Sequence, residues 1–251
     1  MSEEFAWVAA PWGQALQCRA LGVVPHGWTT RQLRLRGAPA LERAGWAAIG
    51  ESIGLPPDHL VRLSQVHGSA VHVATNKPCG IPQADIVVSD VADRVVAVQV
   101  ADCSPLLTAD RSGRFVAASH AGWRGTAADV AGVTVRALTE RFGASTESLT
   151  AAIGPCIGPC CYEVGEELVG AFEAMGWSAA DCDRWFVRRA GTMYLDIWRA
   201  NADQLRRAGV PDRQIHVSRL CTACHPDWFD SYRRDGAGTG RLAGFIRPVP
   251  A

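Results

Sequence analysis

The sequence predicts a domain that mixes strands with helices, of the α/β or α+β class. Short apolar, β-branched runs have the length and composition of strands. They occupy residues 61–66, 71–74, 85–89, 94–101, 114–119, 149–153 and 215–219. Longer segments between them place apolar residues at three- and four-residue steps, which is the helical period. Strands and helices mixed in this way indicate a layered domain, although the order of the strands does not follow from the sequence.

Three segments combine the helical period with a glycine at the end, where the left-handed conformation closes a helix. They run over 126–143, 164–176 and about 194–208. In the first of them, Thr126 can cap the N-terminus. Residues 1–60 read instead as a loop-rich region without a clear pattern.

Length and charge limit the classes of protein that fit. The chain has 251 residues, which suits a single domain over 1–251, and 25 basic side chains balance 25 acidic ones. A nucleic-acid platform needs a surplus of Lys and Arg, so we expect no nucleic-acid partner. The N-terminus lacks a secretory leader, and the most apolar stretch is interrupted by Gln99 and Asp102. We therefore expect a soluble cytoplasmic protein that does not bind membranes.

Nine cysteines are an unusually rich set for a reduced compartment, where they serve as core residues, nucleophiles or metal ligands. Cys221-Thr-Ala-Cys224-His225 fits the attachment motif of c-type haem, but that attachment requires export, so we reject it. The two cysteines can instead form half of a four-thiolate zinc site. The other half would come from Cys156, Cys160 or Cys161, and buried structural thiols are the alternative.

Three of the predicted strands are followed by a residue that can bind a metal. His67 ends RLSQVHG, Cys103 follows Asp102 at the end of RVVAVQVADC, and His120 lies in RFVAASHAGWRG. Two imidazoles and one thiolate are donors that Zn²⁺ prefers. Three protein ligands leave a fourth position open, as in catalytic zinc sites. Each histidine taken alone is more often a hydrogen-bonded structural residue than a metal ligand.

Arginines among glycines indicate places where an anion can bind. Arg124 lies in a glycine-bearing turn that leads into a helix, where free N–H groups and the helix dipole favour negative charge. Arg233, Arg234 and Arg241 form a second such corner near the C-terminus. Solvated surface turns are the alternative for both.

Five motifs occur in an order that carries a family resemblance: QVHG, ADC, HAGWRG, IGPCIGPCCYEVG and SYRRDG-x-GTGR. With them the chain resembles the laccase-domain family, whose members were first named polyphenol oxidases and are now described as purine nucleoside phosphorylases. The match runs from about His26 to the C-terminus. It is poorest around Arg31, and Ser104 after ADC stands where the family often has an apolar residue.

The resemblance implies a four-layer α/β/β/α fold like the catalytic domain of cytotoxic necrotising factors. It also implies a zinc ion on His67, Cys103 and His120. The implied activity is phosphorolysis of adenosine, inosine and methylthioadenosine to the free base and ribose 1-phosphate, with adenosine deamination as a second reaction. The partners are then a purine nucleoside and phosphate, and the oligomeric state stays open.

Roles can be assigned to residues on this reading. Arginines align phosphate through paired hydrogen bonds, and Arg124, Arg233 and Arg31 are the candidates in falling order. Deamination requires a carboxyl group that carries protons, and the matched motifs offer Asp85, Asp102 and Glu163.

The older oxidase name fits the composition poorly. The chain has seven histidines and no His-x-His pair, and its methionines are Met1, Met175 and Met193. We therefore expect any bound copper to be adventitious.

Two other functions remain open. One is a hydrolase with Cys103 as nucleophile and His120 as base, acting on amide bonds of cell-wall precursors. The other is a non-catalytic binding module in which zinc is closed off by a fourth ligand such as Cys156.

Overall fold

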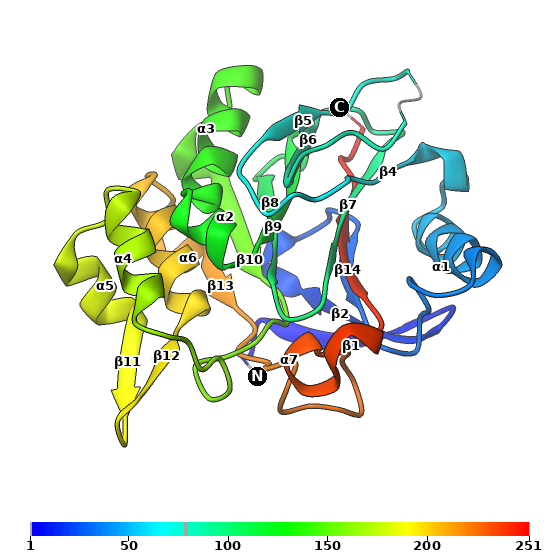
Figure 1. Ribbon diagram of the computed structural model, residues 1–251. Coiled ribbons are helices and arrows are strands. Elements are labelled where there is room, and N and C mark those ends of the chain that lie inside the picture. The colour runs from blue at the N-terminus through cyan, green and yellow to red at the C-terminus, as the bar shows by residue number, and fades with distance from the viewer. Residues whose placement is uncertain (1, 78–79, 251) are drawn as a thin grey trace.

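Two β-sheets stacked on each other form the centre of the computed structural model, which describes residues 2–77 and 80–250 (Figure 1). The first sheet has the order β1-β2-β3-β14-β7-β4. Its strands are Phe5–Ala10, Gly13–Cys18, His26–Thr29, Leu242–Ile246, Val95–Val100 and Leu60–Val61. The second has the order β13-β10-β8-β9-β6-β5. Its strands are Ile215–Val217, Leu149–Ile153, Ser104–Asp110, Val116–Ala121, Ile86–Ser89 and Val71–Val73.

Helices cover the outer faces of both sheets. The first sheet is covered by α1 (Pro39–Ser52), and the second by α2 (Trp123–Ala127), α3 (Val130–Phe142) and α6 (Ile197–Arg207). Two further helices, α4 (Glu167–Ala174) and α5 (Ala179–Trp185), lie beside the hairpin β11–β12 (Phe186–Arg189 and Thr192–Leu195). The short helix α7 (Tyr232–Asp235) lies near the C-terminal end of the chain. Single 3₁₀ turns span Arg19–Leu21, Pro57–His59, Thr146–Ser148, Asp212–Gln214 and Gly236–Gly238.

The two-residue period of the strands divides their side chains between the layers. In β7, Val96 and Val98 face the second sheet, whereas Val95 and Ala97 pack with the α1 side of the molecule. The strands of the second sheet divide in the same way between the inter-sheet layer and the helices. The result is a helix–sheet–sheet–helix arrangement of layers, and the likeness to cytotoxic necrotising factors stays a prediction.

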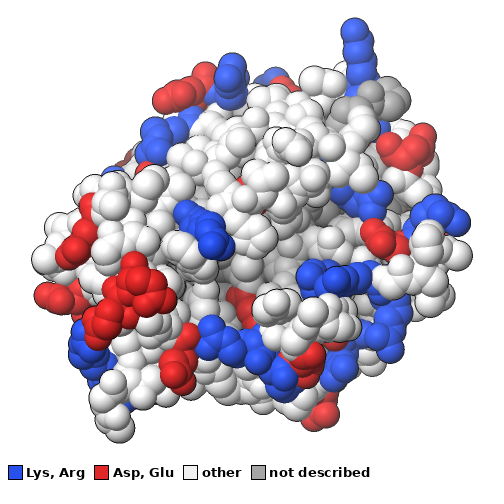
Figure 2. Space-filling view, in the orientation of Figure 1, with Lys and Arg blue, Asp and Glu red and all other residues white. Residues whose placement is uncertain are grey.

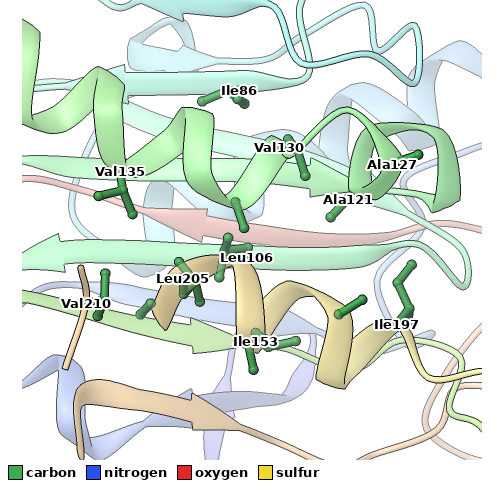
Figure 3. Close-up of a cluster of buried hydrophobic side chains, with 14 of the residues drawn as sticks. Ile86, Leu106, Ala121, Ala127, Val130, Val135, Ile153, Ile197, Leu205 and Val210 are labelled. Atoms are coloured by element: carbon green, nitrogen blue, oxygen red, sulfur yellow. The ribbon is translucent and has the colours of Figure 1, made fainter. Parts of the chain in front are cut away.

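The core between the second sheet and its helices is closely packed (Figure 3). Val130 and Val135 of α3 and Leu205 of α6 point toward Leu106 and Ile153 of the sheet. Leu106 is fully buried, and burial of such a side chain contributes about 2 kcal/mol to stability. This core fixes β8 and β9, which carry the candidate site.

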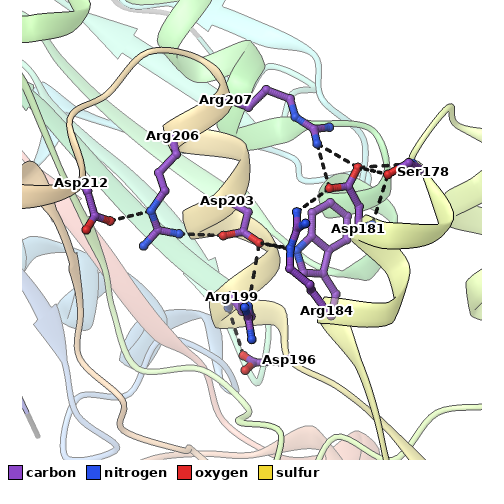
Figure 4. A network of polar contacts seen from close by, with 10 residues as sticks. Ser178, Asp181, Arg184, Asp196, Arg199, Asp203, Arg206, Arg207 and Asp212 are labelled. Carbon is purple, nitrogen blue, oxygen red and sulfur yellow. Dashed lines mark hydrogen bonds and ion pairs between the residues drawn. The ribbon is translucent and has the colours of Figure 1, made fainter.

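An ion-pair network ties α5 to α6 at the surface (Figure 4). The buried Asp181 carboxylate accepts hydrogen bonds from Arg207 and from the Ser178 hydroxyl, and it pairs with Arg184. Burial alone would raise the pKa of Asp181, but Arg207 and Ser178 outweigh it and lower this pKa to about 2. The network stabilises the packing of α5 against α6.

Every strand predicted from the sequence has a counterpart, and several are shorter than predicted. The run 61–66 forms a strand only over Leu60–Val61, because the chain then leaves the sheet and Ser64 bridges to Gln83. The prediction of a loop-rich region over 1–60 was wrong, since β1, β2, β3 and α1 lie there. Glycines disguise α1: a Cβ on Gly45 would lie 2.3 Å from the carbonyl oxygen of Arg34, so tight packing requires this weak helix former.

The helix predicted over 126–143 is two helices. Asp129 adopts a left-handed φ of 58° between α2 and α3. Thr126 is therefore not a cap; it lies inside α2, and its hydroxyl accepts a hydrogen bond from Asn201. Gly143 does end α3 in the left-handed conformation, as expected. The segment 194–208 begins as the end of β12, and Asp196 caps α6. Among the residues that the structure describes, no helix is long and apolar enough to cross a membrane.

Candidate active site

His67, Cys103 and His120 meet at one edge of the paired sheets. Antiparallel pairing of β8 with β9 sets Ser104 opposite Ala121 and Pro105 opposite His120, so Cys103 lies next to the imidazole. The His67 ring approaches from the turn before β5, with its centroid 4.8 Å from that of His120. The ligand atoms of all three residues lie within 4.8 Å of one another. The structure thus brings together the trio that the sequence singled out.

A glycine makes this approach possible. A Cβ on Gly122 would lie 3.0 Å from Cys103 Sγ and 3.2 Å from the His67 ring. Contacts that short force neighbouring atoms apart, so a side chain at this position would push the trio open.

Asp85 fixes the positions of two members of the trio through hydrogen bonds. Its carboxylate is fully buried and accepts hydrogen bonds from the backbone N–H groups of His67 (3.0 Å) and Gly68 (2.7 Å). It also lies 2.8 Å from His120 Nδ1. The first two bonds stabilise the left-handed φ of 62° at His67, which is a strained conformation for a non-glycine residue. The contact with His120 Nδ1 leaves the Nε2 atom of this ring directed at Cys103. Carboxylates orient metal-binding histidines in the same way, by hydrogen bonding to the ring nitrogen that does not bind the metal.

The charges of the trio are coupled. Burial alone would raise the pKa of the Cys103 thiol, but the His120 and His67 rings outweigh burial and lower this pKa to about 6. Burial alone would lower the pKa of His120, but the Cys103 sulfur and the Asp85 carboxylate raise it to about 9. The site therefore favours a thiolate beside a positive charge, which a metal ion also supplies.

The donor set fits a zinc ion. Bonds of about 2.0–2.1 Å to nitrogen and about 2.3 Å to sulfur in a tetrahedron place neighbouring ligand atoms about 3.3–3.6 Å apart. The three donors lie within 4.8 Å of one another, so convergence on one ion requires movements of about an ångström. Exposure differs among them: His120 is buried, Cys103 half-buried and His67 exposed. A fourth coordination position of the ion would therefore be accessible from the side of His67.

Two cavities adjoin the trio, and His67, Cys103 and Tyr232 border both. The first, of about 450 Å³, has polar and apolar walls in nearly equal parts, and its polar residues include Gln65, Gln99 and Arg241. The second, of about 290 Å³, has a mostly apolar wall. That wall includes Trp123, Ile157, Tyr162 and Ile197, with Arg124 and Arg233 beside them. Cavities of this size take small molecules.

Asp102 connects the trio to the C-terminal segment. This residue has a left-handed φ of 81° and precedes Cys103. Its buried carboxylate accepts hydrogen bonds from the Thr222 hydroxyl (2.5 Å) and the Arg233 backbone N–H (2.6 Å). Both oxygens are thus occupied by protein groups, and they fix α7 against the second cavity.

The predicted phosphate-binding arginines occupy different places. Arg124 is exposed above the Trp123 ring, and Arg233 lies over Tyr162 and donates to the carbonyl oxygen of Glu163. Both line the second cavity. Arg31 pairs with Asp230 and donates to a backbone carbonyl, and it is not among the residues that line either cavity. Figure 2 shows a hollow near the middle of the molecule with Lys and Arg side chains on its rim.

Sequence reasoning left out several residues of the two cavities. Trp123, Tyr162 and Tyr232 stand inside the quoted motifs HAGWRG, CCYEV and SYRRDG, so the motifs themselves were the available signal. The Gln65 side chain donates to the carbonyl oxygen of Gln99 and accepts from its backbone N–H, and no local sequence pattern predicts this pairing.

Glu163 and Cys156 are not members of the trio. Glu163 is exposed, and its backbone bridges to Tyr194. The buried Cys156 sulfur accepts a hydrogen bond from Trp198 Nε1 at 2.7 Å. In the described part of the chain Cys156 belongs to neither group of clustered metal-ligand atoms, so it does not complete the trio.

The family follows from comparison with known proteins. A family model described as multi-copper polyphenol oxidoreductase laccase matches residues 32–248. The chain belongs to this laccase-domain family. Purine nucleoside phosphorylase YlmD of Geobacillus stearothermophilus is 35% identical over 79% of this chain and 75% of its own length. Purine nucleoside phosphorylase YfiH of Escherichia coli is 39% identical over 76% of this chain and 74% of its own length.

Solved structures support the same assignment. The hypothetical protein YfiH of Bacillus licheniformis superposes with a TM-score of 0.88, covering 98% of this chain and all of that one, at 25% identity. YlmD of Geobacillus stearothermophilus gives a TM-score of 0.84 at 29% identity, covering 94% of this chain and 96% of its own. The family description speaks of copper, whereas neither Met175 nor Met193 lines a cavity beside the trio.

Proposed function

We propose that this protein is a zinc-dependent purine nucleoside phosphorylase that converts adenosine, inosine or methylthioadenosine to the free base and a ribose 1-phosphate. The observation that carries the proposal is the convergence of His67, Cys103 and His120 between the first cavity and the second, which has aromatic walls and is called the aromatic cavity below. Relatives that carry the phosphorylase name support the reaction class. A cytoplasmic location without nucleic-acid or membrane partners remains our prediction from composition.

The aromatic cavity suits the purine. Trp123 and Tyr162 offer ring faces on which a flat heterocycle can stack, and Ile157 adds an apolar wall. A base held there points its sugar toward the trio, since His67 and Cys103 border the same cavity.

Phosphate requires cationic donors near the anomeric carbon of the sugar. Arg241 lines the first cavity beside Gln65 and Gln99. Burial, together with the neighbouring Arg36 guanidinium, lowers the pKa of Arg241, so an anion bound there would relieve a repulsion between two cations. Arg124 and Arg233 can hold the anion from the other side. Arg31 can act on phosphate only indirectly, through the segment that it contacts.

In the reaction a phosphate oxygen bonds to C1′ while the bond from C1′ to the purine nitrogen breaks. The electron pair passes to the base, which takes up a proton, and the sugar is oxocarbenium-like in the transition state. The arginines hold the incoming anion in line, and the aromatic walls hold the leaving base in place. A zinc ion held by the trio would supply a Lewis acid that polarises a substrate atom.

Adenosine deamination is the second reaction that we propose. Asp85 accepts hydrogen bonds from the backbone and lies against His120, and Asp102 is held by Thr222 and Arg233. We assign Asp85 as a positioning residue for His120, and Asp102 as the carboxylate nearest the substrate.

One observation favours a second function. Asp85, His120 and Cys103 follow one another in hydrogen-bonding order, and the pKa shifts describe a thiolate beside an imidazolium. Without a metal this is the arrangement of a cysteine hydrolase, which could act on amide bonds. A thiolate that binds zinc is a poor free nucleophile, so the metal content of the purified protein separates the two functions.

The deciding experiment is chromatography of the products formed from inosine and from adenosine, with and without phosphate. Hypoxanthine that forms from inosine only when phosphate is present establishes phosphorolysis. Hypoxanthine that forms equally without phosphate indicates hydrolysis, and inosine from adenosine reports deamination. Absence of any turnover by zinc-loaded protein would reject the proposed function.

A further inference from the structure

A second group of sulfurs lies outside the trio. Cys160 and Cys161 come from the loop after β10, and Cys221 and Cys224 come from the segment after β13. The four sulfurs all lie within 4.8 Å of one another. Cys224 Sγ is 3.4 Å from Cys160 Sγ and 3.3 Å from Cys161 Sγ.

These spacings match a tetrahedron of sulfurs around one ion. Zinc–sulfur bonds of about 2.3 Å place the corners of such a tetrahedron about 3.8 Å apart. The two separations from Cys224 Sγ lie about 0.4–0.5 Å below this value, and no pair of the four sulfurs is farther apart than 4.8 Å. A disulfide would instead bring two sulfurs to about 2.05 Å and leave the others apart. Cys224 Sγ is nearly equidistant from the sulfurs of Cys160 and Cys161. Such spacing is expected when several sulfurs bind one ion, and not when two of them form a disulfide.

The backbone holds both cysteine pairs in place. A turn closed by the Cys224 N–H and the Cys221 carbonyl joins one pair, and a turn closed by the Cys161 N–H and the Gly158 carbonyl presents the other. The two segments are joined by a parallel bridge between Cys156 and Cys221. Gly158 N–H donates to Cys221 Sγ at 3.2 Å, and such a bond favours the thiolate form of the sulfur.

Positive charge surrounds the group. Four thiolates with one divalent cation carry a net charge of −2, which is costly unless cations lie nearby. Arg189 donates to the carbonyl of Pro159, and Arg233 donates to the carbonyls of Cys161 and Glu163. Arg234 donates to the carbonyls of Thr222 and Ala223 on the other segment. Three guanidinium groups are thus attached to the two cysteine-bearing segments.

We propose that Cys160, Cys161, Cys221 and Cys224 bind a second zinc ion in a closed, four-thiolate structural site. The ion joins two segments that form a wall of the aromatic cavity. Tyr162 follows Cys161 and lines that cavity, and Thr222 follows Cys221 and donates to Asp102 beside the trio. The site therefore fixes the wall of the cavity without contacting substrate.

The test is the metal content of the reduced, purified full chain, measured by mass spectrometry of the elements. We expect two zinc ions per chain in the unaltered protein, one in Cys103→Ala, one in Cys224→Ser and none in the double variant. Cys182→Ala, a change of a buried cysteine outside both groups, is the matched control and keeps two. The proposal fails if Cys224→Ser holds as much zinc as the unaltered chain, or if Cys103→Ala holds none.

A second measurement does not depend on the folding of cluster variants. Cobalt loaded into Cys103→Ala, in which all four cysteines of the second group remain, should keep about four-fifths of the sulfur-to-cobalt absorption of the cobalt-loaded unaltered chain, because four of the five thiolate ligands remain. A weak absorption, disulfides among the four cysteines, or iron in place of zinc would overturn the assignment. The proposed function is tested separately: one zinc with phosphorolysis rejects only the second site, and two zincs without turnover reject only the phosphorylase.

Discussion

The two sulfur-containing groups differ in how the chain builds them and in what surrounds them. The trio draws one ligand each from three distant places, includes two imidazoles and borders two cavities. The four-cysteine group draws two ligands from each of two turns and has no imidazole. Three mixed ligands beside cavities suit a reactive ion, whereas four thiolates satisfy an ion completely. Ligand number and adjoining space thus indicate which group performs chemistry.

The change Cys103→Ala should have the largest effect, because it removes a ligand from the reactive group alone. Phosphorolysis of inosine should fall by about 1000-fold or more, since the Lewis acid is lost from the site. Product chromatography measures the rate, and Cys182→Ala serves as the control. Full phosphorolysis together with full metal content in Cys103→Ala would show that Cys103 is not a ligand.

Asp85→Asn should weaken the trio while leaving the four-cysteine group intact. The neutral amide loses the charged partner of His120 and an acceptor for the backbone around His67. Zinc affinity at the trio should fall by about 10- to 100-fold, as measured by competition with a chelator. Asp110→Asn is the matched control, because Asp110 is a buried carboxylate of β8 that accepts from Ser112 and Phe115. Equal affinities in the two variants would leave Asp85 with no role in metal binding.

The arginines distinguish the two cavities beside the trio. Arg241→Ala should raise the KM for phosphate by about 10-fold or more, because a half-buried charge bound to an anion contributes about 1.5–3 kcal/mol. Arg233→Ala should have a smaller effect, since this guanidinium already donates to the Glu163 carbonyl. Arg136→Ala on the exposed face of α3 should change nothing. A larger effect from Arg233→Ala than from Arg241→Ala would indicate that phosphate binds in the aromatic cavity.

The smallest effect on activity is expected at the α5–α6 network. Asp181, Arg184 and Arg207 belong to neither group of metal-ligand residues and line neither cavity beside the trio. Asp181→Asn should lower the free energy of unfolding by about 1–3 kcal/mol and leave phosphorolysis unchanged at neutral pH. Because the pKa of Asp181 is lowered on folding to about 2, its contribution is present above about pH 4 and is lost as the pH falls toward 2. Urea unfolding at pH 7 and pH 3 checks this: the difference between the variant and the unaltered chain should shrink at the lower pH.

Much of the site could be predicted from the sequence because its residues lie in strongly patterned places. His67 directly follows a predicted strand, Cys103 comes two residues after another, and His120 lies within β9. The region 1–60 could not be read, because β1 is rich in alanine and α1 contains glycines that its packing requires. Thr126 was misread as a cap because a left-handed Asp129 interrupts a periodic helix without changing its apolar pattern.

The sequence by itself determined the chemistry on offer: the imidazoles, the thiols, the arginines among glycines and the ordered motifs of a family. Local pattern also determined most strands of the second sheet, since β-branched runs select extended structure. Only the tertiary structure decided which groups meet. It placed Arg241 rather than Arg31 beside the trio, directed Cys156 to Trp198, and gathered Cys160, Cys161, Cys221 and Cys224 into one cluster. Strand register and long-range packing set these distances, and neither is written in the local sequence.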